Sequence, residues 1–279
     1  NTPFNQNKPS IARLGSNFVI VWHSDKQDAS GSGNYGVYGQ LFDGGDGTKI
    51  GGEFLINTET SESQDNPSVA GLSNGKFVVA WESSNQDTSD SDGIYAQVFN
   101  ADTSKDGSEF RVNTETTEDQ NKPSVAALPG GAFVVVWQSY KQVSAGSAND
   151  IFGQLFNADK SKNGQEFQIN THVGSTQYQP SVTAISSGFV VVWASNQDPG
   201  YGVYAKMYDG SGAPIAKPTT DDANTAEDGA DAYEFRVNTY TTGNQDYPSI
   251  TGLADGGFVI AYESENRDNT QSASPSSDE

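Results

Sequence analysis

An internal repeat dominates this sequence. Pro-Ser followed by Val or Ile recurs about every 57 residues, with a longer last interval that contains a polar insertion at 217–232. The five copies begin at Pro9, Pro67, Pro123, Pro180 and Pro248. A repeat of this length predicts one supersecondary unit per copy, with each unit packed against its neighbours.

Each unit is expected to contain four short β-strands, as the second unit shows. Residues 67–72 and 76–83 read as two strands joined by a tight turn at 73–75. Residues 93–99 and 109–114 follow, and apolar and polar residues alternate in both, as in half-buried strands. The second strand is apolar almost throughout, so we expect both of its faces to be covered.

These units predict an all-β fold, a β-propeller of four-stranded blades around a central channel. Four repeats are complete and the fifth has only its first two strands, which is compatible with four or five blades or with part of a larger ring. An open row of repeats is disfavoured because each blade needs neighbours to bury its faces. We assign 1–268 to propeller repeats and 269–279 to a flexible polar tail. The units start near residues 9, 67, 123, 180 and 248.

Composition excludes several classes of function. The 279 residues include 15 Lys+Arg against 36 Asp+Glu, a net charge of −21, and no Cys. Such an acidic chain is poorly suited to nucleic acid or anionic lipid, and no apolar stretch approaches the ~18 residues of a membrane span. We therefore expect no nucleic-acid partner and no membrane insertion. Disulfides, thiolate zinc sites and cysteine nucleophiles are excluded as well.

Residues that recur at fixed positions are expected to serve the fold. The Trp that ends the second strand in the first four units, with Tyr262 in register in the fifth, is a core residue by this reasoning. The Glu of Gly-x-Glu-Phe and the Gln three residues before Pro-Ser are expected to hydrogen-bond loop backbone. Glycoside hydrolysis needs two carboxyl groups in different environments, whereas these acids are the same in every unit. We therefore predict that the chain is not an enzyme.

The repeat resembles a family of known repeats. It contains Pro-Ser-Val-Ala-x-Leu, Gly-x-Phe-Val-Val-x-Trp-x-Ser, Gln-Asp, Gly-Ile-Tyr-x-Gln-x-Phe and Gly-x-Glu-Phe-x-Val-Asn-Thr. This pattern is similar to repeats that tile large secreted bacterial surface proteins, including RTX-type adhesins. The resemblance implies an extracellular or cell-surface location and calcium binding. The chain departs from the pattern in the third unit, where Gln142-Val143 replaces Gln-Asp, and it lacks the calcium-binding nonapeptides of RTX tails.

Two acidic loops are candidates for a calcium site. Calcium prefers several oxygen ligands from closely spaced Asp, Asn and carbonyl groups on a Gly-bearing loop. The candidate ligands are Asp43 and Asp46 in one loop and Asp87, Asp90 and Asp92 in the other. The alternative interpretation is that these residues solvate the surface and set turns.

The leading functional hypothesis is a non-catalytic extracellular module, structural or adhesive, in a cell-surface or filament-forming protein. Its partners would be copies of itself, neighbouring domains of a longer chain, or surface glycans. The alternative is a carbohydrate-binding propeller lectin with Tyr35 and Tyr201 as glycan-binding residues, although single exposed aromatic residues are common. A glycoside hydrolase is the second alternative, with no catalytic residue assigned.

Overall fold

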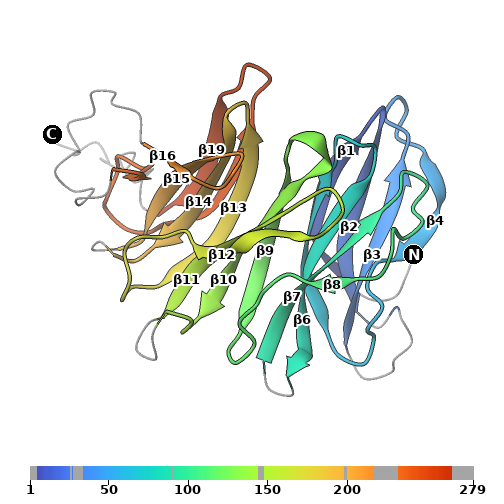
Figure 1. The fold of residues 1–279 in the computed structure, drawn as a ribbon, viewed down its shortest axis with the longest axis horizontal. Coiled ribbons are helices and arrows are strands. Elements are labelled where there is room, and N and C mark those ends of the chain that lie inside the picture. The colour runs from blue at the N-terminus through green and yellow to red at the C-terminus, as the bar shows by residue number, and fades with distance from the viewer. Residues whose placement is uncertain are drawn as a thin grey trace, which may run out of the picture.

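The computed structural model describes residues 5–25, 27, 34–88, 91–143, 148–197, 200–216 and 232–265. These residues form five antiparallel sheets, which we call blades 1 to 5 in chain order (Figure 1). One turn of 3-10 helix, Pro129–Gly131, is the helical element of this described part. No helix in it is long and apolar enough to cross a membrane. The predicted tail, 269–279, lies outside the described residues.

Each of the first three blades has four strands, and blade 4 has a divided fourth strand. Blade 1 contains β1 (Gln6–Leu14), β2 (Asn17–Asp25), β3 (Tyr35–Phe42) and β4 (Lys49–Leu55). Blade 2 contains β5 (Gln64–Gly71), β6 (Phe77–Thr88), β7 (Ser91–Phe99) and β8 (Phe110–Arg111). Blade 3 contains β9 (Gln120–Ala127), β10 (Phe133–Tyr140), β11 (Asn149–Phe156) and β12 (Lys162–Gln168). Blade 4 contains β13 (Gln177–Ile185), β14 (Gly188–Ser195), β15 (Gly202–Asp209), β16 (Pro214–Ile215) and β17 (Glu234–Arg236), and blade 5 contains β18 (Gln245–Gly252) and β19 (Phe258–Ser264).

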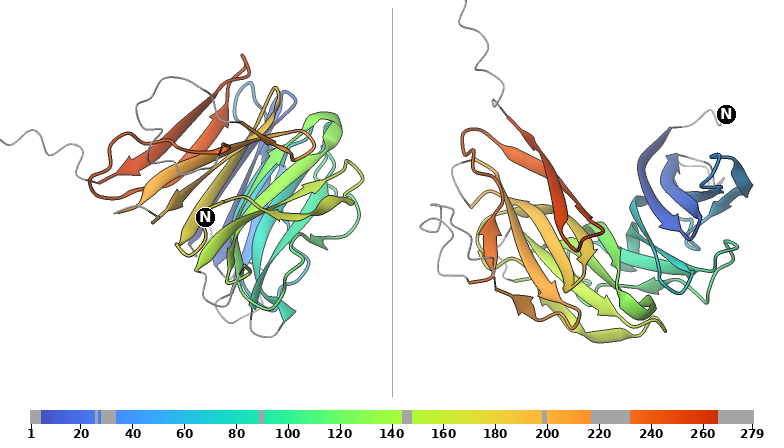
Figure 2. Two further views of the ribbon diagram at one scale, coloured as in Figure 1. Left: turned by 60° about the vertical axis from the view of Figure 1, so that its left-hand side comes forward. Right: turned by 90° about the horizontal axis from the view of Figure 1, so that it is seen from above.

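The arrangement of the sheets confirms the predicted β-propeller. The first strands of consecutive blades pack against one another, β1 on β5, β5 on β9, β9 on β13 and β13 on β18. Figure 2 shows the sheets fanned around a common axis, with blades 1 and 5 at the two ends of the arc. Of the ring sizes that the sequence left open, the described residues form five blades, of which the fifth has two strands.

Each interface between consecutive blades is a hydrophobic core supplied by both faces of the second strands. In β6, Phe77, Val79 and Trp81 pack against blade 1, whereas Val78 and Ala80 pack against blade 3. All five side chains are fully buried. The prediction that this strand is covered on both faces is therefore confirmed. Trp81, Trp137 and Trp193 are core residues as predicted, and Trp22, whose blade has no preceding blade among the described residues, is half-buried.

The recurring Glu and Gln residues hold backbone where the chain passes between blades, as predicted. Glu109 Oε2 accepts a hydrogen bond from Thr58 N at 2.6 Å, and Glu166 Oε2 accepts one from Thr114 N at 2.6 Å. Each of these bonds joins one blade to the loop that leaves the preceding blade. Gln120 is fully buried and donates to Glu118 O at 3.1 Å.

Blades 2 and 3 share a carboxylate beside the end of the second strand, although the Gln-Asp motif is present only in blade 2 of these two. In blade 2, Asp87 of the Gln-Asp pair accepts a hydrogen bond from Asn113 Nδ2 at 2.7 Å and lies against Gly93, where a Cβ atom would come within 2.5 Å of it. In blade 3 the residue in register with Gly93 is Asp150, which accepts the bond from Asn170 Nδ2 at 2.8 Å. Asp150 thus supplies the carboxylate that Gln142-Val143 lacks.

Candidate active site

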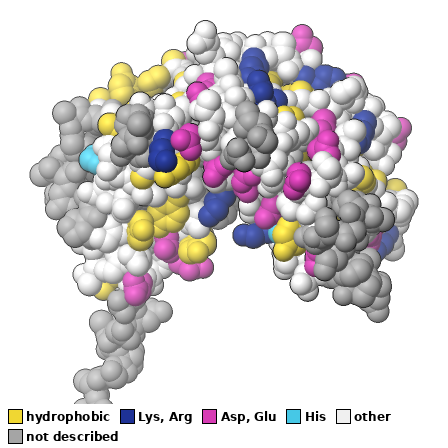
Figure 3. Space-filling model, turned by 90° about the horizontal axis from the view of Figure 1, so that it is seen from below, with side chains coloured by type: hydrophobic (Ala, Val, Ile, Leu, Met, Phe, Trp, Pro, Cys, Tyr) yellow, Lys and Arg dark blue, Asp and Glu magenta, His cyan; other side chains and the backbone are white. Residues whose placement is uncertain are grey.

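The axis of the propeller holds a cavity of about 510 Å³ at the level of the Pro-Ser repeats. Figure 3 shows this face of the molecule hollowed, with both acidic and basic side chains around the hollow. The residue before each Pro-Ser lines the cavity, and its identity changes from blade to blade. These five residues, which we call the pre-proline positions, are Lys8, Asn66, Lys122, Gln179 and Tyr247.

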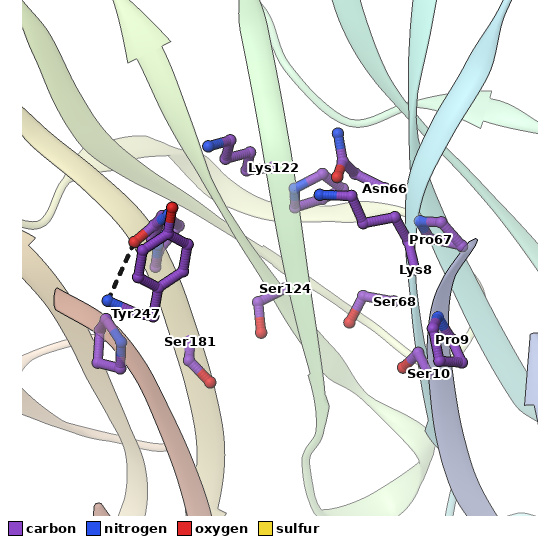
Figure 4. A pocket seen from close by; sticks show the side chains of 14 residues that line it. Lys8, Pro9, Ser10, Asn66, Pro67, Ser68, Lys122, Ser124, Ser181 and Tyr247 are labelled. Carbon is purple, nitrogen blue, oxygen red and sulfur yellow. Dashed lines mark hydrogen bonds between the residues drawn. The ribbon is translucent and has the colours of Figure 1, made fainter. Parts of the chain in front are cut away.

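An unusual backbone conformation aims the pre-proline side chains at the axis. All five residues have positive φ, between 48° and 55°. This left-handed conformation is uncommon outside glycine, and a following proline disfavours the helical alternative. Each one lies at a register shift between the first and second strands, which interrupts the alternation of the pleat. Figure 4 shows the side chains of Lys8, Asn66, Lys122 and Tyr247 extending into one end of the cavity.

The serines of the first four Pro-Ser pairs join the inner strands of consecutive blades. Ser10 Oγ accepts a hydrogen bond from Val69 N of the next blade at 3.2 Å, and Ser124 Oγ accepts one from Val182 N at 3.2 Å. The same bond recurs at Ser68 and Ser181. Pro-Ser is therefore constant because it joins the inner strands, whereas the residue before it differs between blades.

Glu82, which follows Trp81 in β6, is half-buried and contacts two of the residues that line the cavity. Its Oε2 accepts hydrogen bonds from Lys122 N at 3.1 Å and from Asn66 Nδ2 at 2.9 Å. Burial raises the pKa of Glu82 to about 7, the two hydrogen bonds oppose that rise, and the nearby Asp92 and Asp65 add to it. Glu82 is thus close to half protonated at neutral pH.

Asp65 lies on the other side of Asn66 and has the opposite tendency. Its Oδ1 pairs with His23 Nδ1 and accepts a hydrogen bond from Asn66 N at 2.5 Å. Burial alone would raise the pKa of Asp65, but the bonds from His23 and Asn66 outweigh burial and hold that pKa below its usual value. The His23 ring stacks on Tyr35, with ring centroids 4.5 Å apart. Asp65 is therefore ionised under conditions where Glu82 retains its proton.

The residue at the position of Glu82 varies between blades, and only blade 5 has another glutamate there, unlike the acids that recur in the sequence. The register of the second strands places His23, Gln138, Ala194 and Glu263 at this position in blades 1, 3, 4 and 5. Sequence reasoning missed Glu82 because it looked for acids that recur. The signal that could have found it is a polar residue that varies at a fixed register in an otherwise constant strand.

The candidate calcium ligands are not brought together. Asp43 Oδ1 accepts a hydrogen bond from Gly45 N at 2.8 Å, and Asp46 Oδ1 accepts one from Thr48 N at 2.9 Å, so both shape their own turn. Asp87 is taken by Asn113 and by Tyr95 OH at 2.7 Å. Asp92 lies at the start of β7, and its N–H donates to Asp119 Oδ1 at 3.2 Å. Asp90 lies outside the described residues, among which no three His, Asp or Glu residues cluster as a metal site. Calcium binding stays a prediction.

The two candidate glycan-binding tyrosines lie on different blades. Tyr35, on blade 1, is half-buried against His23. Tyr201 precedes β15 on blade 4 and meets the Tyr178 ring edge-on, with centroids 5.0 Å apart. The axial cavity is lined by neither of them. Their role in glycan binding also stays a prediction.

Solved structures with this architecture include several enzymes. The chain resembles the GH93 α-L-arabinofuranosidase of Fusarium graminearum, solved with arabinobiose, with a TM-score of 0.61, 12% sequence identity and coverage of 94% of this chain and 76% of that one. It also resembles an endo-arabinase from Bacteroides thetaiotaomicron, with a TM-score of 0.49, 14% identity and coverage of 93% and 89%. A GH43 endo-arabinanase from Bacillus licheniformis gives a TM-score of 0.46, 12% identity and coverage of 75% and 76%. No protein-family model and no curated protein sequence matches the chain.

These findings correct the leading functional prediction. The chain was expected to be a non-catalytic structural or adhesive module because its acids appeared equivalent in every unit. Those recurring acids are equivalent, as Glu109 and Glu166 show, but the premise left out Glu82 and Asp65, whose environments blades 1, 3 and 4 do not reproduce. The similar structure with a TM-score of 0.61 is a glycoside-cleaving enzyme by its description, an α-L-arabinofuranosidase. The expectation that the chain is not an enzyme rested on the same premise and is corrected as well. At 12% identity, the likeness to the arabinofuranosidase itself shows the fold alone.

Proposed function

We propose that this protein is a glycoside hydrolase and that Glu82 and Asp65 are its two reacting carboxyl groups. The observation that carries the proposal is that two carboxyl groups flank Asn66, which lines the axial cavity: Glu82 accepts a hydrogen bond from Asn66 Nδ2, and Asp65 accepts one from Asn66 N. The pKa values of these two carboxyl groups are shifted in opposite directions. Glycosidases need one carboxyl group that keeps its proton and one that has lost it, and different environments produce this difference. The propeller fold shared with the arabinofuranosidase is in keeping with this function.

The hydrogen bonds of Glu82 indicate which of its oxygens reacts. Oε2 already accepts two hydrogen bonds, from Lys122 N and Asn66 Nδ2. A proton on Glu82 therefore belongs on Oε1, for which the described residues provide no hydrogen-bond donor. From Oε1 the proton passes to the glycosidic oxygen as the bond between that oxygen and the anomeric carbon breaks.

Asp65 supplies the negative charge that the anomeric carbon needs. It either attacks that carbon directly, forming a glycosyl ester that water then hydrolyses, or removes a proton from the water that attacks. Its side chain is 29% exposed, so solvent and substrate reach it. The anomeric configuration of the first product, read by proton NMR, distinguishes the two routes.

Replacement of Glu82 by Gln tests the proposal. We expect the wild-type chain to hydrolyse at least one member of a panel of aryl glycosides and oligosaccharides, with arabino-oligosaccharides included. Glu82→Gln should lower kcat at least about 100-fold, because general acid catalysis contributes 10²–10⁴-fold. Glu53→Gln is the matched control, since Glu53 is a partly exposed acid on β4 that bonds Gln27 and Lys49.

Two outcomes would contradict the proposal. One is turnover by Glu82→Gln at the wild-type rate. The other is the absence of turnover by a folded wild-type chain across the whole panel, with folding verified by near-UV circular dichroism.

A further inference from the structure

The charged side chains that line the axial cavity have the sign opposite to the rest of the protein. The chain carries 36 Asp+Glu and 15 Lys+Arg, yet the charged residues of the cavity lining are Lys8 and Lys122. Neither lysine forms an ion pair with a described residue at hydrogen-bond range. Lys8 acts on Asp65 only through space, where its charge helps to lower the pKa of that carboxyl group.

Of the other three pre-proline side chains, two already form hydrogen bonds within the protein and the third is aromatic. Asn66 Nδ2 is bonded to Glu82, and Gln179 Oε1 accepts a hydrogen bond from Tyr247 N at 3.1 Å, drawn as the dashed line in Figure 4. The Tyr247 side chain is 59% exposed at the same end of the cavity. Among the pre-proline side chains, the groups left to meet a ligand are therefore two ammonium groups and one aromatic ring.

We infer that the cavity binds an acidic glycan, in which Lys8 and Lys122 contact a carboxylate or sulfate group of the sugar and Tyr247 packs against a sugar ring. Ammonium groups donate strong, charge-assisted hydrogen bonds to such anions. An aromatic ring offers the apolar surface that sugar-ring C–H groups require. The inference rests on the proposed function, because that function makes a glycan the ligand.

Gln substitutions at the two lysines test this inference without changing the backbone of the inner strands. Gln179 already occupies a pre-proline position with φ of 55°, so Lys8→Gln and Lys122→Gln suit the same backbone. Lys49→Gln is the matched control, because Lys49 lies on β4 and its side chain is 61% exposed. Binding is measured by calorimetry in the Glu82→Gln background, so that hydrolysis does not consume the ligand.

The ligands are a galacturonic acid trimer, the same trimer after reduction of its carboxyl groups, and a sulfated galactose trimer. We expect at least one anionic trimer to bind about tenfold or more tightly than the neutral trimer. Lys122→Gln or Lys8→Gln should remove that preference, whereas Lys49→Gln should keep it. Added salt should weaken binding of the anionic trimer and leave the neutral one unaffected. The trimer that binds identifies carboxylate or sulfate as the recognised group.

Equal affinity for neutral and anionic trimers, no binding of either anionic trimer, or lysine variants that behave as Lys49→Gln would overturn the inference. If the chain hydrolyses neutral glycans and the lysine variants have no effect, the acidic-glycan inference is refuted and the proposed hydrolase function is kept. If an anionic trimer binds through the lysines but the wild-type chain turns over no glycan, the binding inference is kept and the hydrolase function is refuted.

Discussion

Gln138 in blade 3 occupies the position that Glu82 occupies in blade 2, and each accepts a hydrogen bond from the backbone N–H of the next pre-proline residue. The bond runs from Gln179 N to Gln138 Oε1 at 3.4 Å and from Lys122 N to Glu82 Oε2 at 3.1 Å. An amide oxygen therefore fulfils the structural role of this position. The fold does not require a half-buried carboxyl group at Glu82, so Glu82→Gln tests the chemistry without removing the structural hydrogen bond.

Glu82→Gln should stabilise the protein, and more so at higher pH. The pKa of Glu82 is about 7 in the folded chain against an ordinary value of 4.5, so the folded state binds the proton more tightly than the unfolded state. Stability consequently falls as pH rises from about 4.5 through about 7, by roughly 3 kcal/mol at most from this group. Urea unfolding of both proteins at pH 5 and pH 8 measures the difference. A gap between the two proteins that does not widen from pH 5 to pH 8 would refute the assignment.

His23→Phe should raise the pKa of Asp65. The phenyl ring can keep the stack on Tyr35 but removes the Nδ1 partner that helps to hold Asp65 ionised. Asp65 would then lose its charge at a higher pH, and the acidic limb of the kcat profile should move upward in pH. Carbon-13 NMR of the Asp carboxyl groups follows the titration directly. His172→Phe, at an exposed turn, should leave the titration of Asp65 unchanged.

Asp150→Gly should destabilise blade 3, and Val143→Asp should restore part of the loss. Glycine at 150 recreates the space that Gly93 provides in blade 2 but leaves Asn170 without its carboxylate. Loss of a buried hydrogen bond to a charged group lowers the free energy of unfolding by about 1–3 kcal/mol. Aspartate at 143 then takes the place that Asp87 has in blade 2. Denaturant unfolding of both single variants and the double variant forms the test, and additive effects would contradict this account.

Trp137→Phe should destabilise the protein more than Trp81→Phe. Both indoles are fully buried, but Trp137 Nε1 donates to Gln120 Oε1 at 2.9 Å, whereas Trp81 Nε1 has no hydrogen-bond partner among the residues that the structure describes. The substitutions remove similar volumes, so the difference isolates the hydrogen bond and the acceptor left behind, about 1 kcal/mol or more. Denaturant midpoints for the two variants give the comparison. Equal losses would show that Trp81 Nε1 has an acceptor.

The sequence was sufficient for the fold because its hydrophobic pattern repeats. The strands of blade 2 lie within a few residues of the predicted ranges, and Trp81, Trp137 and Trp193 are buried as expected. The candidate site was missed because it depends on which residue from one blade meets which backbone group of the next. Neither the burial of Glu82 nor the left-handed conformation of Asn66 can be read from spacing along the chain. An extracellular location and the resemblance to RTX-type adhesin repeats stay predictions.

The backbone at the pre-proline positions accepts several different residue types. Proline and serine fix the path of the inner strand, and lysine, asparagine, glutamine and tyrosine all occupy the position before them with nearly the same φ. One residue per blade can thus be exchanged without altering the registers that close the inter-blade cores. A combinatorial library randomised at these five codons would sample new ligand preferences while the Pro-Ser pairs keep the path of the inner strands.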